Sequence, residues 1–161
     1  MKLILPFSVT IPRKTKEAKV WILNLNNYRN THFHILNQAK VEWGKIVAKA
    51  VDDIQIVSPW MERARDKYGY GYMSPPVPPY KFIYTVYPKD NRSFDLSNVL
   101  SVVEKFTNDA LIDCGVIKND NCKIIPQVDY RFGGVSKTNP RIELEVISID
   151  TTFETAEEAG L

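Results

Sequence analysis

The chain has 161 residues and a formal net charge of +2, with 44% hydrophobic and 25% charged residues. This length is enough for one hydrophobic core and too short for two comfortable domains, so we expect a single domain. The absence of a long apolar run argues against a membrane-spanning segment, and the small net charge does not by itself indicate an anionic partner. Cys114 and Cys122 lack the spacing of a redox pair or a zinc half-site, so we expect neither a disulfide nor a zinc site.

Residues 2–11 alternate between apolar and polar side chains, which predicts a strand, and Pro6 indicates that this strand lies at a sheet edge or contains a bulge. The same segment lacks the features of a signal peptide, so we expect a cytoplasmic protein. A short strand is predicted from Val20 to Leu25, followed by an amphipathic helix over residues 31–52. The apolar positions that predict this helix are Leu36, Ala39, Trp43, Ile46, Val47 and Ala50.

Residues 58–79 contain five prolines and two glycines, which predicts a long loop. Alternation predicts a strand over residues 81–87, and helical spacing predicts a second helix over residues 96–114 that ends at Gly115. Two further strands are predicted over residues 123–132 and 141–149. We therefore expect an α+β fold with a mixed β-sheet layered with two main helices, in one domain over residues 1–153 with a flexible tail over residues 154–161.

The second predicted helix has a polar stripe beside the apolar stripe that faces the core. The stripe consists of Asn98, Ser101, Lys105 and Asp109. Local interpretations exist for each charged residue in this region. Asp95 can cap the helix, Lys105 and Asp109 can form an i,i+4 ion pair, and Asp120 can belong to a turn.

The order of four short motifs is more informative than any single residue. Residues 95–98 read Asp-Leu-Ser-Asn, residues 105–111 contain Lys-x-x-x-Asp-Ala-Leu, residues 115–117 read Gly-Val-Ile, and residues 119–120 read Asn-Asp. This order resembles the RusA family of Holliday-junction resolvases, whose pattern is Asp-Leu-Asp-Asn, Lys-x-x-x-Asp-Ala-Leu, Gly and Asp-Asp. The resemblance extends less specifically to residues 25–30 and 37–40.

The resemblance implies a Mg²⁺-dependent endonuclease that cuts branched DNA, such as a four-way junction, as a homodimer. Asp95 and Asp120 match acidic positions that are catalytic and bind metal in the family, and Lys105 matches a catalytic lysine. This chemistry is physically reasonable, because carboxylates hold Mg²⁺, with Mn²⁺ as an alternative, and the ion polarises the phosphate and lowers the pKa of a bound water. A lysine can offset the charge that develops in the transition state.

Three features depart from the pattern of the family. Ser97 and Asn119 stand where aspartates are usual, and the spacing from Asp95 to Lys105 is four residues longer. Two ligand charges are therefore missing, so the number of ions stays open. The long helix between Asp95 and Asp120 also leaves open whether one chain or two chains complete the site.

Two other interpretations follow from these departures. The chain can be a catalytically impaired protein that binds junction DNA without cutting it. It can also be an unrelated α+β interaction module, in which Asp95 is only a helix cap. Cleavage of a four-way junction with and without Mg²⁺ distinguishes the first interpretation from the nuclease, and failure to bind DNA at low salt would favour the second.

Cations beside aromatic residues suit a surface that follows phosphates and stacks on unpaired bases. The candidate DNA contacts are Arg29, Arg63, Arg65, Lys67 and Tyr70, of which all but the first lie in the predicted loop. The alternative is a solvated loop whose aromatic residues fold onto the body. A second basic run either lies along phosphates or forms a solvated hairpin turn, and it consists of Arg13, Lys14, Lys16 and Lys19.

Overall fold

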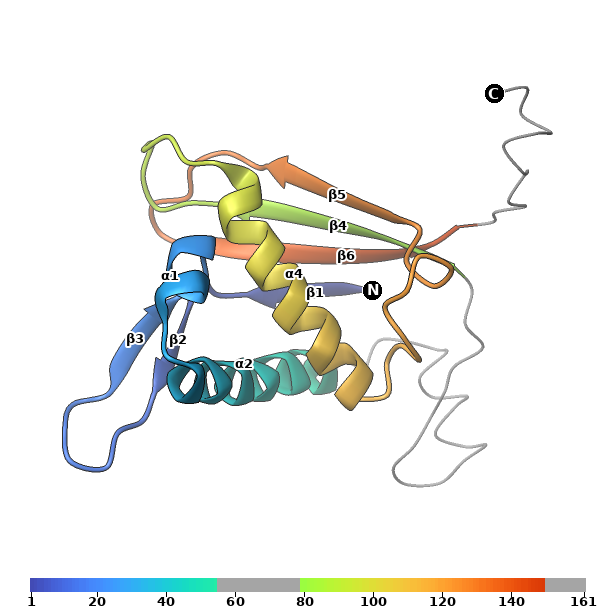
Figure 1. Cartoon of the computed structure of the whole chain (residues 1–161). Helices are drawn as coiled ribbons and strands as arrows, with labels where there is room; N and C mark the ends of the chain where they lie inside the picture. The colour runs from blue at the N-terminus through green and yellow to red at the C-terminus, as the bar shows by residue number, and fades with distance from the viewer. Residues whose placement is uncertain (55–78, 150–161) are drawn as a thin grey trace.

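The computed structural model describes residues 1–54 and 79–149. These residues form a four-stranded mixed sheet, a separate two-stranded hairpin and three helices (Figure 1). The first part contains β1 (Lys2–Leu5), β2 (Ser8–Ile11), β3 (Lys19–Ile22), α1 (Leu25–Asn30) and α2 (Phe33–Ile54). The second contains β4 (Tyr80–Tyr87), α4 (Leu96–Asp113), β5 (Gln127–Phe132) and β6 (Arg141–Ser148). This arrangement confirms the predicted α+β fold with two main helices.

The main sheet has the strand order β1-β6-β4-β5. Strand β6 runs antiparallel to β1 and β4, whereas β4 and β5 are parallel, with Lys81 opposite Gln127. Helix α4 makes the crossover between the two parallel strands, so it runs back from the end of β4 towards the start of β5 (Figure 1). The residues that precede α4 and those that follow it therefore lie at opposite ends of this unit.

Pro6 and Phe7 divide the N-terminal segment into strands of two different sheets, so the prediction of one strand over residues 2–11 is wrong. Strand β1 pairs with β6, whereas β2 pairs with β3. Pro6 has no N–H to donate to a continuing ladder, which favours a break at this position. The alternating pattern is the same on both sides of the break, so the pattern alone does not reveal it.

Helix α1 begins at Leu25, where the sequence predicted the end of a strand, and this part of the prediction is wrong. Strand β3 ends at Ile22, and Asn24 caps the new helix. The side-chain Oδ1 of Asn24 accepts a hydrogen bond from the backbone N–H of Asn27 at 2.8 Å. A single cap residue therefore turns the chain from strand to helix.

Helices α2 and α4 pack on one face of the main sheet, and both confirm their predicted positions to within two residues at each end. The largest buried side chains in this layer include Trp21, Trp43, Phe82, Tyr84, Leu100, Leu111 and Ile142. Alternate residues of the strands point to the other face. That face carries the charged residues Lys2, Lys81, Asp129, Arg141 and Glu143, as expected for a sheet with one polar side.

Two predicted segments fall on residues that the structure does not describe. The loop predicted over residues 58–79 lies outside the described residues except for Pro79, and the tail predicted over residues 154–161 lies outside them entirely. Among the helices of residues 1–54 and 79–149, none combines the length and the apolar character needed to cross a bilayer.

Candidate functional site

Asp95 occupies the N-cap position of α4, as its local interpretation predicted. Its Oδ1 accepts hydrogen bonds from the backbone N–H and the side-chain hydroxyl of Ser97, at 3.2 and 2.9 Å. The side chain is exposed, and no donor among the described residues forms a hydrogen bond with Oδ2. One carboxylate oxygen therefore anchors the helix, which its dipole favours, while the other is open to a cation.

Asp120 lies in the loop after α4, and buried neighbours fix the start of this loop. Gly115 ends the helix with a φ of 70°, a conformation that favours glycine. Val116 and Ile117 are only 5% and 2% exposed, so they hold the chain against the core. Asp120 itself is exposed, and within the described part of the chain its carboxylate forms no hydrogen bond or ion pair.

Two asparagines shape the turn before β5. The Oδ1 atom of Asn119 accepts a hydrogen bond from the backbone N–H of Asn121 at 2.9 Å, and the carbonyl oxygen of Asn121 accepts one from Ile124 at 2.9 Å. These turns delay the strand to Gln127, so its predicted start at Lys123 is wrong. One of the two lone pairs of the Asn119 Oδ1 atom is therefore used to hold the turn.

Lys105 projects from the exposed side of α4 and does not pair with Asp109, so the predicted i,i+4 pair is wrong. Asp109 pairs instead with Lys40 of α2, whose Nζ lies 2.8 Å from Oδ2. Lys40 also lies over the ring of Phe106, 5.5 Å from its centroid, which holds the ammonium group near Asp109. Lys105 is left exposed and takes no part in the ion pairs of residues 1–54 and 79–149.

The three candidate catalytic residues are not brought together within one chain. Helix α4 has 18 residues, so at about 1.5 Å per residue it is about 27 Å long. Asp95 lies just before this helix and Asp120 after it, and Lys105 is about 15 Å along the axis from Asp95. Groups of three or more His, Cys, Asp or Glu side chains that could hold a metal do not occur among the described residues. Each candidate carboxylate therefore stands apart from the other in a single chain.

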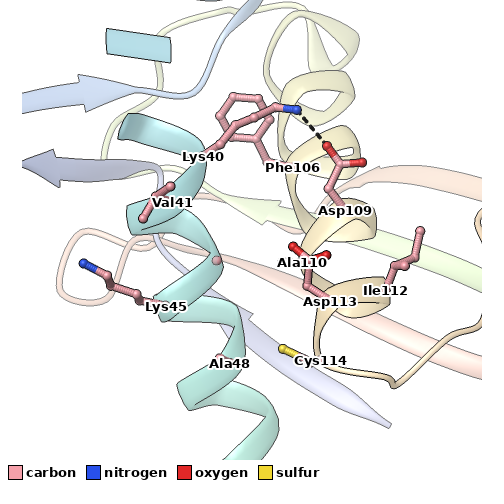
Figure 2. A pocket seen from close by; sticks show the side chains of 11 residues that line it. Lys40, Val41, Lys45, Ala48, Phe106, Asp109, Ala110, Ile112, Asp113 and Cys114 are labelled. Atoms are coloured by element: carbon pink, nitrogen blue, oxygen red, sulfur yellow. Dashed lines mark hydrogen bonds and ion pairs between the residues drawn. The ribbon is translucent and has the colours of Figure 1, made fainter. Parts of the chain in front are cut away.

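A groove of about 660 Å³ runs between α2 and α4 (Figure 2). The apolar residues that line it include Val41, Ala48, Phe106 and Ala110, and the charged residues along it are Lys40, Lys45, Asp109 and Asp113. Figure 2 shows the ion pair between Lys40 and Asp109 spanning the two helices. The groove does not include Asp95, Lys105 or Asp120, so it is separate from the candidate catalytic residues.

Three polar contacts, two buried and one partly buried, fix the rotation of α4 about its axis, and sequence reasoning missed them. The contacts join Trp43 with Thr107 at 3.1 Å, Tyr84 with Asn108 at 3.5 Å, and Tyr130 with Glu104. Burial, followed by the hydrogen bond to Glu104, raises the pKa of Tyr130, so its phenol stays protonated and donates. The available signal was the polar pair Thr107 and Asn108 on the core-facing side of an apolar helix.

Arg29 is the member of the candidate DNA contacts that falls within the described residues. It is exposed in the last turn of α1 and forms no ion pair with another described residue. The remaining candidates, Arg63, Arg65, Lys67 and Tyr70, lie outside the described residues. The second basic run lies at the turn between β2 and β3, which confirms its placement in a hairpin turn, whereas its contact with phosphates stays a prediction.

Comparisons of the sequence with protein-family models and with curated proteins found no match. The resemblance to the RusA family therefore rests on the order of the motifs between residues 95 and 120, and it stays a prediction.

Proposed function

We propose that this chain is a Mg²⁺-dependent endonuclease that cuts branched DNA, such as a four-way junction, as a homodimer. The proposal draws on the motif order and is carried by one structural observation. Asp95 and Asp120 are exposed at opposite ends of α4, and each keeps at least one carboxylate oxygen without a hydrogen-bond donor among the described residues. Exposed, unpaired carboxylates of this kind are available to a metal ion and to DNA.

The donor set fits a hard divalent cation. Carboxylate oxygens are the ligands that Mg²⁺ and Mn²⁺ prefer, so Asp95 and Asp120 are the residues that would hold the ion. When bound, the ion supplies Lewis-acid polarisation of the phosphodiester. Ser97 contributes a hydroxyl that holds Asp95 in place rather than a second negative charge. The site therefore has fewer charges than the family pattern, and we expect it to need a higher Mg²⁺ concentration.

Lys105 is proposed to hold a phosphate rather than to contact the ion directly. Its position about 15 Å along α4 from Asp95 separates it from that carboxylate. An exposed lysine without an acidic partner is suited to bind the DNA backbone between two sites. Lys105→Ala is therefore expected to raise KM more than it lowers kcat, whereas a selective loss of kcat would assign the lysine to the transition state.

Two copies of the chain would allow Asp95 and Asp120 to meet at one ion. If a two-fold axis crosses α4 near its middle, the two helices run antiparallel, and Asp95 of one copy approaches Asp120 of the partner subunit. The same symmetry produces two equivalent sites. A four-way junction needs two cuts, so this arrangement matches the proposed substrate.

The experiment mixes two inactive variants and measures nicking of a labelled four-way junction. Asp95→Asn and Asp120→Asn are each expected to be inactive alone. If each site is completed between chains, a mixed dimer has one site with both Asp95 and Asp120 intact. If each site is completed within a chain, both sites of the mixed dimer lack one of these aspartates. Random exchange makes half of the dimers mixed, so we expect up to about one quarter of the wild-type nicking, since each mixed dimer has one intact site of two. Wild-type protein with Mg²⁺ and with EDTA provides the controls.

A catalytically impaired junction-binding protein is the second candidate, because two polar side chains at the motif are neutral and already used within the fold. Ser97 donates to Asp95, and Asn119 accepts from the following turn. Tight binding of a four-way junction without nicking in either Mg²⁺ or Mn²⁺ would support this function. Absence of binding to branched and duplex DNA at low salt would exclude both candidates and favour an interaction module.

A further inference from the structure

The hairpin formed by β2 and β3 extends beyond the neighbouring helices, and its loop is exposed. Ile11 is paired with Lys19 at the end of the hairpin, so residues 12–18 connect the two strands. Val9 and Trp21 are buried and anchor the strands in the core, whereas every residue of the loop is exposed. Figure 1 shows the loop reaching past the start of α2. The hairpin therefore presents its loop to a partner without rearrangement of the core.

Positive charge is concentrated on this loop. Arg13, Lys14 and Lys16 are accompanied by a single acid, Glu17, so the loop has a net charge of +2, equal to that of the whole chain. Lys19 adds a further cation at the first residue of β3. None of these four cations takes part in the ion pairs found among residues 1–54 and 79–149. Their charge is therefore available to an anionic partner.

Helix α1 connects the hairpin to α4. Asn27 of α1 donates a hydrogen bond from Nδ2 to the carbonyl oxygen of Ile22 in β3 at 2.8 Å. On its other side, Tyr28 packs edge-on against Phe106 of α4, with ring centroids 6.1 Å apart. In Figure 1, α1 lies between the hairpin and α4. These contacts hold the base of the hairpin, through α1, against the middle of α4.

We propose that the loop between β2 and β3 binds the phosphate backbone of a nucleic-acid duplex, with Arg13, Lys14 and Lys16 on phosphates and Arg29 continuing the contact towards α4. The identity of the duplex as one arm of a branched DNA cut near Asp95 rests on the proposed function. A DNA duplex carries about one negative charge per 1.7 Å of its axis, so three cations on a short loop can each reach a phosphate. A two-stranded ribbon also fits a major groove about 12 Å wide.

The composition of the loop favours a phosphate backbone over a protein partner. Besides its charged residues, the loop contains only Pro12, Thr15 and Ala18, and so lacks aromatic and long aliphatic side chains. Protein interfaces depend on such side chains for most of their binding energy. Contacts to phosphates use cations and small hydroxyl residues, both of which the loop supplies. An anionic membrane attracts the same cations, so binding to phosphatidylserine vesicles is measured as well.

The experiment measures binding of the full chain to a labelled four-way junction, and to one of its duplex arms, by fluorescence anisotropy in EDTA over a range of KCl concentrations. Lys14→Gln with Lys16→Gln removes two charges from the loop. Lys45→Gln with Lys49→Gln removes two charges from α2 as the control, in which Lys45, unlike the loop lysines, is paired with Glu42. The loop variant is expected to bind roughly fivefold more weakly at low salt and to reduce the slope of log K against log salt by about 1 to 2. The control is expected to keep the wild-type slope, and thermal unfolding verifies that both variants are folded.

All outcomes except the last separate the loop from the nuclease site. Equal losses of DNA affinity in both double variants, or an unchanged salt slope in the loop variant, would overturn the loop as a specific contact. If the wild type still nicks the junction in Mg²⁺, the proposed function stays intact in that case. Loop-dependent binding without any nicking would support the loop and overturn the nuclease. Loss of binding to phosphatidylserine vesicles, with DNA binding unchanged, would assign the loop to a membrane surface. A wild-type chain that binds no DNA overturns both proposals.

Discussion

Trp43 donates a hydrogen bond from its indole Nε1 to Oγ1 of Thr107 over 3.1 Å, and both side chains are fully buried between α2 and α4. An indole N–H in an apolar core needs a partner, so this contact fixes the two helices relative to each other. Helix α4 begins at Asp95 and carries Lys105 on its exposed side. The buried bond therefore determines which side of the helix these candidate residues occupy.

Thr107→Val is expected to destabilise the protein by about 1 to 3 kcal/mol, because an almost isosteric side chain leaves the indole N–H of Trp43 buried without an acceptor. Urea unfolding followed by tryptophan fluorescence measures the change. Thr10→Val makes the same substitution at an exposed position of β2 and is expected to change stability by less than about 0.5 kcal/mol. Equal effects at both positions would show that the buried hydrogen bond contributes nothing specific.

The ion pair between Lys40 and Asp109 can be tested with a double-mutant cycle. Because both side chains are partly exposed, the coupling between Lys40→Met and Asp109→Asn is expected to be only about 0.2 to 1 kcal/mol. Lys105→Met combined with Asp109→Asn is the control cycle and is expected to show no coupling above error. Unfolding in urea at low salt gives both values. Coupling of Asp109 to Lys105 rather than to Lys40 would restore the local pair that the sequence predicted.

Glu143 is expected to make stability fall in acid. Its carboxylate is buried, which by itself raises the pKa, but hydrogen bonds from Lys2 and Arg141, at 2.6 and 2.7 Å, outweigh burial and lower the pKa. A lowered pKa in the folded state means that the stabilisation is fully present above the unfolded pKa of about 4.3 and is lost as the pH falls through the folded pKa.

The contribution of Glu143 is measured through the free energy of unfolding from pH 7 down to pH 3. We expect Glu143→Gln to be less stable than the wild type near neutral pH, with a difference that shrinks below about pH 4 as the wild-type carboxylate is protonated. Glu17→Gln removes the same charge from the exposed hairpin loop and is expected to follow the wild type. A difference between wild type and Glu143→Gln that stays constant with pH would contradict this assignment.

The elements that sequence reasoning located correctly are those with a strong local period. The apolar side chains of α2 and α4 recur at helical spacing, so both helices are found to within two residues, and Gly115 marks the end of α4. Sequence reasoning fails where one local pattern continues across a change of partner strand. The alternation across Pro6 is uniform, yet β1 and β2 belong to different sheets because each half finds its own partner strand.

The candidate site was predictable as a set of residue types but not as a geometry. Spacing identified Asp95 as a helix cap, which depends on its immediate neighbours alone. The partner of Asp109 was not predictable, because Lys40 is brought to it by the packing of two helices rather than by sequence spacing. The separation of Asp95 from Asp120 depends on a crossover whose direction is set by the parallel pairing of β4 and β5.

Substitutions at Asp95 can separate its role as a cap from its proposed role as a metal ligand. Asparagine caps a helix about as well as aspartate, so Asp95→Asn is expected to keep the stability of the wild type within about 0.5 kcal/mol and yet to lose Mg²⁺-dependent nicking. Asp95→Ala removes the cap as well and is expected to cost about 1 kcal/mol of stability.

Ser97→Ala is the matched control, since it removes the hydroxyl bonded to Asp95 and keeps the carboxylate, so nicking should persist at a raised Mg²⁺ requirement. Urea unfolding and junction nicking on the same preparations give both quantities. Full nicking by Asp95→Asn would reduce Asp95 to a helix cap and remove it from the proposed site.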